Sequence, residues 1–570
     1  MTRPPAGRLV ALLVTILFAF GGIFARLAVL QVADQSSLVK LGYDQRVHTL
    51  ALPAQRGEIV DRTLAPLALS IDARDIYADP QLVTDPLGES AKIAPVLGLR
   101  PWAVRGALSG TGTFAYVARQ VDVGVATRLE AMHLPGLGFI PVPKRTYPAG
   151  PLASQVLGFV GIDGAGLAGL EKQYNAVLAG TAGERTQELG ANGAPITQGV
   201  DLLQAPVPGQ DLVTTIDRQL QYQAEAALER AVKDNHAKGG TIIVMDPHTG
   251  DILAMASYPT YDPNTFATAK QEAMCNRALT DAFEPGSVNK TITASVAIQE
   301  HTVSESQRFT VPWTLQVGPF TIHDSHPHGL EQMTLGDIVA QSSNIGAVMV
   351  ARTIGSNLLA SYLAKFGFGR TTGLAFPGET AGVVPSLASW TSATLATVAY
   401  GQGLTVSPLQ MASVYATIAN GGTWVQPRLV RGTVDGNGTF LAAPASPTRS
   451  VVSPATASTV TQMLSMVVQD GTGLAAQIPG YQVAGKTGTA LISDPNGGYY
   501  RNRYVASFIG FLPASDPQVV VAAVIDEPTT IYGGVAAAPL FQHVAQYAIQ
   551  RLGIAPGQDV PLPPSAIPHR

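Results

Sequence analysis

Charged residues and cysteine are the two components in which this chain is poorest. Charged side chains make up only 13% of its 570 residues, and the formal net charge is −4. Because binding to nucleic acid draws on a basic excess that neutralises phosphates, we exclude nucleic acid as an expected partner. The single cysteine, Cys275, cannot form an internal disulfide or a cysteine metal site, so we expect it to act as a small apolar side chain.

The chain also lacks a second long apolar run. Residues 9–30 contain the one stretch that approaches the ~20 apolar residues needed to span a bilayer. This run is longer than the core of a typical signal peptide, and no clear small-residue cleavage site follows it, so we expect an uncleaved anchor. Arg3 and Arg8 precede the run and predict residues 1–8 to be a cytoplasmic tail. The expected location is the plasma membrane, crossed once, with the rest of the chain on the outer side.

Beyond the anchor, the sequence predicts two modules and a tail. Residues 34–205 are rich in glycine, proline and short β-like runs, and we expect an extended β-rich accessory module. In residues 211–552, strand-like runs at both ends enclose helix-rich sequence. This order indicates an α+β domain whose antiparallel sheet combines strands from distant segments. The proline-rich residues 553–570 are expected to form a disordered tail.

Several local patterns support the α+β prediction for the second module. Asp217 has the residue type of a helix N-cap, and apolar residues recur after it at helical spacing. Residues 240–257 are typical of a hairpin whose turn contains Gly250. Residues 505–512 and 519–526 are strand-like, and a helical pattern follows them.

Ser287 and Lys290 form a serine–x–x–lysine pattern within residues 281–290, DAFEPGSVNK. Residues three apart on a helix lie on the same side, which places the Lys290 amine within reach of the Ser287 hydroxyl. Serine is a weak nucleophile without an adjacent base, and lysine can act as that base once burial or a nearby cation lowers its pKa. The pattern therefore predicts a nucleophile and its base.

Ser342 and Asn344 form a serine–x–asparagine pattern at the start of an apolar helical run. A hydroxyl in this position can relay a proton, and an amide can hold a substrate carbonyl. The pattern is weak by itself, because Ser287 and Asn289 also match it. It gains meaning only together with the other patterns.

A strand-like segment near the carboxyl terminus contains a lysine–threonine–glycine–threonine stretch, formed by Lys486, Thr487, Gly488 and Thr489. On an edge strand, Gly488 would let a ligand approach the backbone closely. Backbone N–H groups along such an edge can bind an extended peptide or stabilise an oxyanion. We expect Lys486 to supply the positive charge that lowers the pKa of Lys290.

The order of the three patterns along the chain is that of the catalytic set of penicillin-binding proteins and related β-lactamases. Further matching segments are RGEIVDR, RTYPAGPLASQVLGFVG and GLAGLEKQYN in the accessory module, and GQGLTVSPLQMA, VAGKTGTA and YVASFIGFLP in the second module. The chain is therefore similar to the class B penicillin-binding proteins, the monofunctional peptidoglycan D,D-transpeptidases. The segment FEPGS resembles the division (septal) members more than the elongation members.

This resemblance implies a pedestal, or dimerisation-like, module and a transpeptidase domain with a five-stranded antiparallel sheet flanked by helices. It implies that Ser287 attacks the penultimate D-Ala of a stem peptide, that Lys290 takes the serine proton, and that Ser342 passes a proton to the leaving amine. An amine from a neighbouring stem peptide then resolves the acyl-enzyme. β-Lactams should acylate Ser287, and the reaction needs no metal and no cofactor.

The resemblance also assigns the binding residues and the partners. Asn344 would orient the acyl donor, while Thr487 and Thr489, with Lys486 nearby, would hold the terminal carboxylate. Backbone N–H groups of Ser287 and Thr489 would form the oxyanion hole. The implied partners are a membrane-embedded glycan polymerase of the SEDS type and other divisome proteins.

Three other functions stay open from the sequence. The chain could serve cell elongation, could hydrolyse its acyl-enzyme as a D,D-carboxypeptidase or β-lactamase does, or could be a non-catalytic β-lactam-binding sensor. Glu379 lies in the region where some β-lactamases carry a deacylating glutamate, but its context, PGE-x-x-G, resembles penicillin-binding proteins. We therefore expect Glu379 to be structural.

One histidine-rich stretch suggests a metal site. His323, Asp324, His326 and His328 lie in HDSHPH, but their spacing is irregular. We favour a polar loop near the mouth of the cleft over a metal centre.

Overall fold

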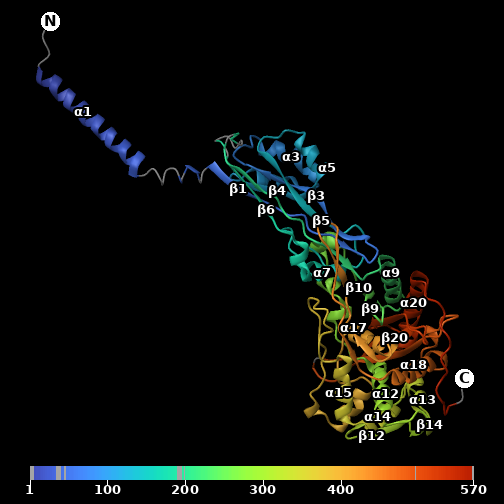
Figure 1. Cartoon of the computed structure of the whole chain (residues 1–570). Helices are drawn as coiled ribbons and strands as arrows, with labels where there is room; N and C mark the ends of the chain where they lie inside the picture. Colours follow the sequence, from blue (N-terminus) through green and yellow to red (C-terminus); the bar gives the residue numbers. More distant parts are fainter. Residues whose placement is uncertain are drawn as a thin grey trace. The chain divides into compact units, whose positions relative to one another are not determined.

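The structure is a computed structural model that describes residues 6–33, 40, 42–43, 46–188, 190, 196–197, 199–494 and 496–567 (Figure 1). The chain divides into two compact units, residues 1–55 with 180–208 and residues 56–179 with 209–570. The first five residues of the expected cytoplasmic tail and the last three of the expected C-terminal tail lie outside the described residues.

The first unit contains one long apolar helix and a small sheet. Helix α1 spans Ala6–Ala28 and continues into the π-helical stretch η1, Val29–Ala33. Within the described part of the chain, Ala6–Gln31 is the one helical stretch that is long and apolar enough to cross a bilayer. The sheet is antiparallel, in the order β1 (Val47–Leu52), β6 (Gly183–Glu188) and β7 (Asp201–Gln204).

The second unit begins with a sheet that joins both predicted modules. Its strand order is β17-β16-β8-β2-β3-β4, and β5 also pairs with β3. Strand β2 runs parallel to β8, and the other pairs are antiparallel. The strands are β2 (Ile59–Val60), β3 (Pro66–Ala78), β4 (Ala115–Asp122), β5 (Leu137–Thr146), β8 (Asp211–Thr214), β16 (Val430–Val434) and β17 (Phe440–Ala442). The sheet of the accessory module therefore includes strands from residues 211–552, the predicted catalytic module. The order of the segments in the sequence did not indicate this.

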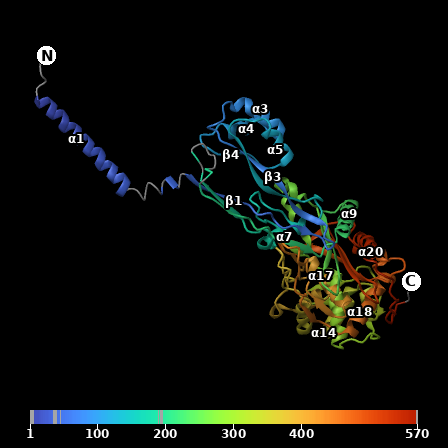
Figure 2. The same ribbon diagram turned by 45° about the horizontal axis from the view of Figure 1, so that its top comes forward.

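Three helices cover the far end of this sheet: α3 (Pro86–Leu97), α4 (Pro101–Leu108) and α5 (Val123–Glu130). Figure 2 shows them grouped beside β3 and β4. A small core of its own holds this part together, with Ile76 of β3 packed among Ile93, Val104 and Leu129 of the helices. Burial of such side chains stabilises by about 1.5–3 kcal/mol each.

Three of the family-like segments converge on one buried carboxylate. Glu171 lies on the short helix α7 (Gly169–Gln173) and is fully buried. Its carboxylate accepts Nε–H bonds from Arg56 at 2.6 Å and Arg145 at 2.7 Å, and the Tyr147 hydroxyl lies 3.2 Å away. One ionic cluster thus joins three segments in space: RGEIVDR, RTYPAGP and GLEKQYN. The short helices α6 (Ser154–Leu157) and α8 (Asn175–Leu178) flank this cluster.

The catalytic module is built on a five-stranded antiparallel sheet, as predicted. The strand order is β10-β9-β21-β20-β19, and the strands are β9 (Gly239–Met245), β10 (Ile252–Tyr258), β19 (Ala484–Ser493), β20 (Tyr499–Leu512) and β21 (Val519–Asp526). The hairpin β9–β10 lies at one edge, and the strand that carries the lysine–threonine–glycine segment lies at the other. Strands separated by more than 200 residues therefore share one sheet, which confirms the α+β class.

Helices cover both faces of this sheet because alternate strand residues point to opposite sides. On β21, Val521 and Ala523 pack with helices α9 (Arg218–Asp234) and α20 (Ala538–Leu552), whereas Val520 and Ala522 belong to the larger core on the other face. Helices α9 and α20 lie side by side in Figures 1 and 2. Asp217 caps α9, as predicted, by accepting two backbone N–H bonds.

The remaining elements lie mostly on the larger core side. The helices are α10 (Gln271–Met274), α11 (Arg277–Thr280), α12 (Lys290–Gln299), α13 (Leu335–Ala340), α14 (Asn344–Ile354), α15 (Ser356–Phe366), α16 (Ser392–Ala399), α17 (Pro408–Ala419), α18 (Pro454–Gln469) and α19 (Gly533–Ala536). The short strands are β11 (Phe309–Val311), β12 (Thr314–Val317), β13 (Phe320–His323), β14 (Glu331–Met333), β15 (Thr423–Val425) and β18 (Thr448–Ser450). The short 3-10 helical turns are η2 (Pro263–Thr268), η3 (Gly286–Asn289), η4 (Leu387–Ser389) and η5 (Leu474–Ala476).

The described part of the C-terminal tail, residues 553–567, differs from the expected disorder. Val560 exchanges two hydrogen bonds with the Gln482 side chain, at 2.6 and 3.1 Å. The Ser565 hydroxyl donates to the Asp337 carboxylate at 2.5 Å. Composition did not reveal this docking because the polar partners lie elsewhere in the chain. Proline also reduces the entropy that such a segment loses on docking.

Candidate active site

Ser287 lies in the turn η3, and Lys290 is the first residue of α12. The Lys290 amine donates to the Ser287 hydroxyl oxygen at 3.0 Å. Lys290 is only 1% exposed, in a helix whose following residues are also buried. The serine–x–x–lysine pattern therefore has the geometry that the sequence predicts.

Lys290 also joins the second pattern to the first. Its amine lies 2.5 Å from the Ser342 carbonyl oxygen, 3.3 Å from the Ser342 hydroxyl oxygen and 2.8 Å from the Asn344 amide oxygen. Ser342 has a left-handed backbone, with φ of 61°, which is uncommon outside glycine. This conformation presents both of its oxygens to the lysine.

Burial lowers the pKa of Lys290 to about 7, and the negative charge of Asp324 opposes this effect. Burial is also the larger cause that lowers the pKa of Lys486, with repulsion from Lys290 as the second. The expectation that Lys486 lowers the pKa of Lys290 is therefore wrong, because burial is the cause that lowers it. An amine with a pKa close to neutral can act as a base at physiological pH.

The third pattern lies on β19, the outer strand of the five-stranded sheet. Lys486 is fully buried, and its amine contacts the carbonyl and hydroxyl oxygens of Thr487, each at 3.3 Å. The Thr487 hydroxyl lies 2.7 Å from that of Thr472, and the Thr489 hydroxyl accepts from the Gly533 backbone N–H at 3.2 Å. Both threonines are thus held in defined positions along the edge strand.

Gly488 allows the edge strand to pack against the nucleophile segment. A Cβ atom at this position would lie 2.2 Å from the Ser507 hydroxyl oxygen, 3.1 Å from Val288 and 3.2 Å from the Pro285 carbonyl oxygen. The sequence predicted that Gly488 makes room for a ligand. The space beside its Cα is instead occupied by the protein's own atoms.

The segment GQGLTV, residues 401–406, contacts the nucleophile loop, which we define as residues 283–287. Phe283 and Val406 exchange backbone hydrogen bonds at 3.0 and 2.9 Å, and the Gly286 N–H donates to the Gly401 carbonyl at 2.9 Å. Gly401 has φ of 83°, and a Cβ atom there would lie 2.1 Å from the Gly286 carbonyl oxygen. Glycine is therefore required where the two loops meet.

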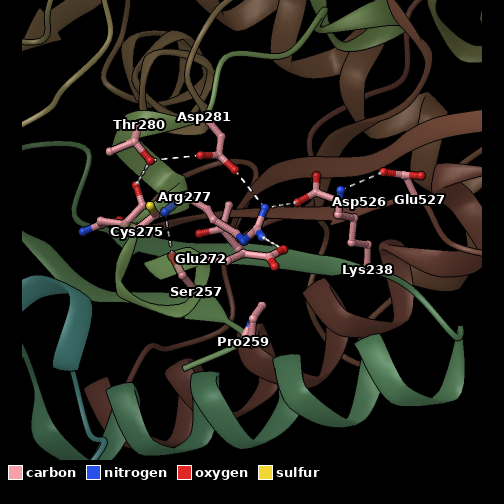
Figure 3. A network of polar contacts seen from close by, with 12 residues as sticks. Lys238, Ser257, Pro259, Glu272, Cys275, Arg277, Thr280, Asp281, Asp526 and Glu527 are labelled. Carbon is pink, nitrogen blue, oxygen red and sulfur yellow. Dashed lines mark hydrogen bonds and ion pairs between the residues drawn. The ribbon is translucent and has the colours of Figure 1, made fainter. Parts of the chain in front are cut away.

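The chain that leads into the nucleophile loop is anchored by Arg277 of α11 (Figure 3). Its guanidinium group binds Asp281 at 2.9 Å, Glu272 at 3.1 Å and Asp526, at the end of β21, at 3.2 Å. Figure 3 also shows Cys275 beside this network; its thiol contacts a backbone carbonyl and is partly exposed rather than fully buried.

Asp324 is the residue of the site whose role the sequence reasoning missed. Its carboxylate accepts the Ser343 hydroxyl at 2.7 Å and the backbone N–H groups of Asn344 at 2.5 Å and Ile345 at 3.0 Å. For this histidine-rich stretch the sequence favours a polar loop over a metal site. Across the described residues, no group of three His, Cys, Asp or Glu side chains could hold a metal ion.

Glu379, the other carboxylate considered from the sequence, lies in a structural setting. Its carboxylate accepts bonds from the backbone N–H of Thr372 at 2.6 Å and from the Thr372 hydroxyl at 2.5 Å. These bonds brace its own loop.

Comparison with known proteins places this geometry in a family. Residues 240–546 match the model of the penicillin binding protein transpeptidase domain, and residues 51–214 match that of the penicillin-binding protein dimerisation domain. Penicillin-binding protein PbpB of Mycobacterium tuberculosis is 36% identical, over 95% of this chain and 83% of that protein. Peptidoglycan D,D-transpeptidase FtsI of Escherichia coli K12 is 33% identical, over 95% of this chain and 91% of that protein.

Solved structures agree with the sequence comparison. Penicillin-binding protein 3 of Mycobacterium tuberculosis, in complex with aztreonam, superposes with a TM-score of 0.72 at 32% identity, over 90% of this chain and 100% of that one. A peptidoglycan synthetase from Bifidobacterium adolescentis gives a TM-score of 0.75 at 28% identity, over 91% of this chain and 100% of that one. The chain belongs to the class B penicillin-binding proteins and is a peptidoglycan D,D-transpeptidase.

Proposed function

We propose that this enzyme cross-links peptidoglycan stem peptides through an acyl-enzyme on Ser287. The observation that carries the proposal is the contact between the Lys290 amine and the Ser287 hydroxyl oxygen at 3.0 Å, with the pKa of Lys290 lowered to about 7 by burial. At neutral pH a large fraction of this lysine is uncharged and able to accept the serine proton.

In the first half-reaction, Ser287 attacks the carbonyl carbon of the penultimate D-Ala as Lys290 accepts the hydroxyl proton. The proton then passes through the Ser342 hydroxyl, 3.3 Å from the Lys290 amine, to the nitrogen of the departing terminal D-Ala. In the second half-reaction, an amine of a neighbouring stem peptide attacks the ester carbon. Its proton returns by the same route, and Ser287 leaves with its hydroxyl restored.

The edge strand β19 and the start of α14 would bind the donor peptide. Asn344 would hold the donor's backbone amide, while Thr487 and Thr489, with Lys486 behind them, would bind the terminal carboxylate. Backbone N–H groups of Ser287 and Thr489 would stabilise the oxyanion, at about 3 kcal/mol per donor. Gly488 permits this arrangement by letting β19 pack against Pro285 and Val288, which lie on either side of Ser287 in the sequence.

We further propose a role in septal wall synthesis, in preference to elongation. The FEPGS segment and the similarity to FtsI support this role. With α1 as a single-pass anchor and its amino terminus in the cytoplasm, the catalytic module would face the wall on the outer side of the plasma membrane. The partners would be a SEDS-type glycan polymerase and other divisome proteins.

The test combines labelling with product analysis. Full-length protein should be acylated by a fluorescent penicillin, whereas S287A should stay unlabelled and S361A, a control at an exposed serine on α15, should label like the parent enzyme. With a D-Ala-D-Ala donor and an amine acceptor, mass spectrometry should show the cross-linked product. Hydrolysed donor alone would indicate a carboxypeptidase, and labelled S287A would refute the assigned nucleophile.

A further inference from the structure

We propose that Asp324 is a positioning residue for transpeptidation, holding Ser342 and Asn344 against Lys290 and balancing the charge around that lysine. This inference rests on the proposed roles of Ser287 and Lys290. It adds a residue to which none of the three catalytic patterns points. Asp324 directly follows β13 and is 5% exposed.

The carboxylate of Asp324 closes the amino-terminal end of helix α14. One oxygen accepts the backbone N–H groups of Asn344 at 2.5 Å and Ile345 at 3.0 Å, and the other accepts the Ser343 hydroxyl at 2.7 Å. The first N–H groups of a helix have no partner within the helix, and a negative charge there is favoured by the helix dipole. Asp324 thereby fixes the helix start to the loop after β13.

This attachment decides where the Lys290 partners lie. Ser342 precedes the capped turn in a left-handed conformation, and its two oxygens, with the Asn344 amide oxygen, make three of the four contacts of the Lys290 amine. The Asn344 amide nitrogen is tied to the same loop through the His323 carbonyl at 3.2 Å. A movement of the helix start would therefore displace the proton relay and the donor-binding amide together.

The negative charge of Asp324 also acts on Lys290 directly. It favours the protonated amine and so opposes burial, which lowers the pKa of Lys290. On the other side, Lys486 of β19 is the basic group whose charge interacts with that of Lys290. The charged groups near Asp324 include His328 and Glu331 of β14. The Nε2 atom of His328 lies 3.1 Å from the Asp324 carboxylate, and the negative charge of Glu331 raises the pKa of His328.

His328 binds Asp324 in a way that suits its charged form. Its Nδ1 atom lies 2.7 Å from the Gly329 carbonyl oxygen, and its Nε2 atom lies 3.1 Å from the Asp324 carboxylate. Both partners are acceptors, so only the imidazolium, with two N–H groups, satisfies both. Burial lowers the pKa of His328, but these two bonds and the charges of Glu331 and Asp324 together outweigh burial, so the pKa is raised. The cation partly offsets the charge of Asp324.

The experiment measures the acylation rate of the full-length enzyme by a fluorescent penicillin as a function of pH. In the parent enzyme the rate should rise as Lys290 loses its proton. In D324N the rate should fall about 10- to 100-fold, because Ser342 and Asn344 are displaced from Lys290. The rise of the rate with pH, which is the acidic limb of the profile, should also move to lower pH, because the charge that favours protonated Lys290 is gone. In H328Q this rise should move to higher pH, because the cation that offsets the charge of Asp324 is removed.

A matched control separates positioning from stability. Asp217 is also a buried carboxylate at a helix N-terminus, where it accepts the N–H groups of Gln219 and Leu220 at 3.1 Å each. D217N should lower the thermal midpoint and leave the acidic limb in place. A D324N enzyme that loses stability like D217N but keeps the parent pH profile would overturn the inference.

The outcomes also distinguish this inference from the proposed function. If S287A stays unlabelled while D324N acylates within twofold of the parent enzyme at the parent pH profile, the nucleophile stands and the role of Asp324 fails. If S287A is labelled, the proposed function itself fails. Should D324N not fold, H328Q decides alone: a limb that does not move would refute the electrostatic role of the Asp324–His328 pair.

Discussion

Replacing Glu171 by glutamine should strongly destabilise the enzyme. The carboxylate is fully buried and binds Arg56 at 2.6 Å and Arg145 at 2.7 Å, whose side chains are 6% and 7% exposed. Glutamine has nearly the same volume, but it removes the charge and places an amide N–H group against one of two donors. Removing one partner of a buried ion pair costs about 3–5 kcal/mol, because the remaining charge is left unpaired. Here two guanidinium groups lose their counter-charge at once.

The assay is thermal and urea unfolding of the full-length enzyme in detergent. At roughly 2 °C for each kcal/mol, E171Q should melt about 6–10 °C below the parent enzyme. E229Q provides the control, because Glu229 forms an exposed pair with Lys233 on helix α9 at 2.6 Å. An exposed pair of this kind contributes little to stability because solvent screens both charges, so E229Q should melt close to the parent.

Two results would refute this reasoning. If E171Q and E229Q shift the melting point equally, burial of the ion pair does not govern its contribution. If E171Q is as stable as the parent, the three segments that meet at Glu171 are held by apolar packing alone.

Two further predictions follow from single positions. G401A should reduce the acylation rate by more than about tenfold, because its Cβ atom would lie 2.1 Å from the Gly286 carbonyl oxygen and displace the nucleophile loop; labelling at the parent rate would contradict this. Burial raises the pKa of Glu225 to about 7, above its ordinary value of 4.5, so the folded state retains a proton that the unfolded state has lost. Stability should therefore fall as pH rises from 4.5 to 7, by up to about 3 kcal/mol. E225Q, which can still accept from the Ala153 N–H, should lack this slope in urea titrations at several pH values, and an unchanged slope would count against it.

The chemistry of the nucleophile could be read from the chain because it depends on neighbours in sequence. Ser287 and Lys290 are three residues apart, and their contact follows from one turn of helix. The cap at Asp217, the β9–β10 hairpin and the strands β20 and β21 were predictable for the same reason, since capping and side-chain periodicity are local properties.

The sequence was less informative where a residue acts through distant partners. Asp324 lies in a histidine-rich stretch for which the sequence predicts only a polar loop, whereas its bonds go to the start of α14 about 20 residues later. Gly488 was read as space for a ligand, but the space is filled by Ser507 and by the nucleophile segment. In each case the role of the residue depends on which side chains the folded chain packs against it.

The sequence by itself determined the long apolar segment near the amino terminus, the alternation of helices and strands and the local pairing of a serine with a lysine, because these follow from composition and spacing. Only the tertiary structure decided that β16 and β17 complete the accessory sheet, that the tail docks on Gln482 and Asp337, and that burial sets the pKa of Lys290. The physical reason is that desolvation, charge balance and hydrogen-bond partners depend on segments that the chain brings together only when it folds.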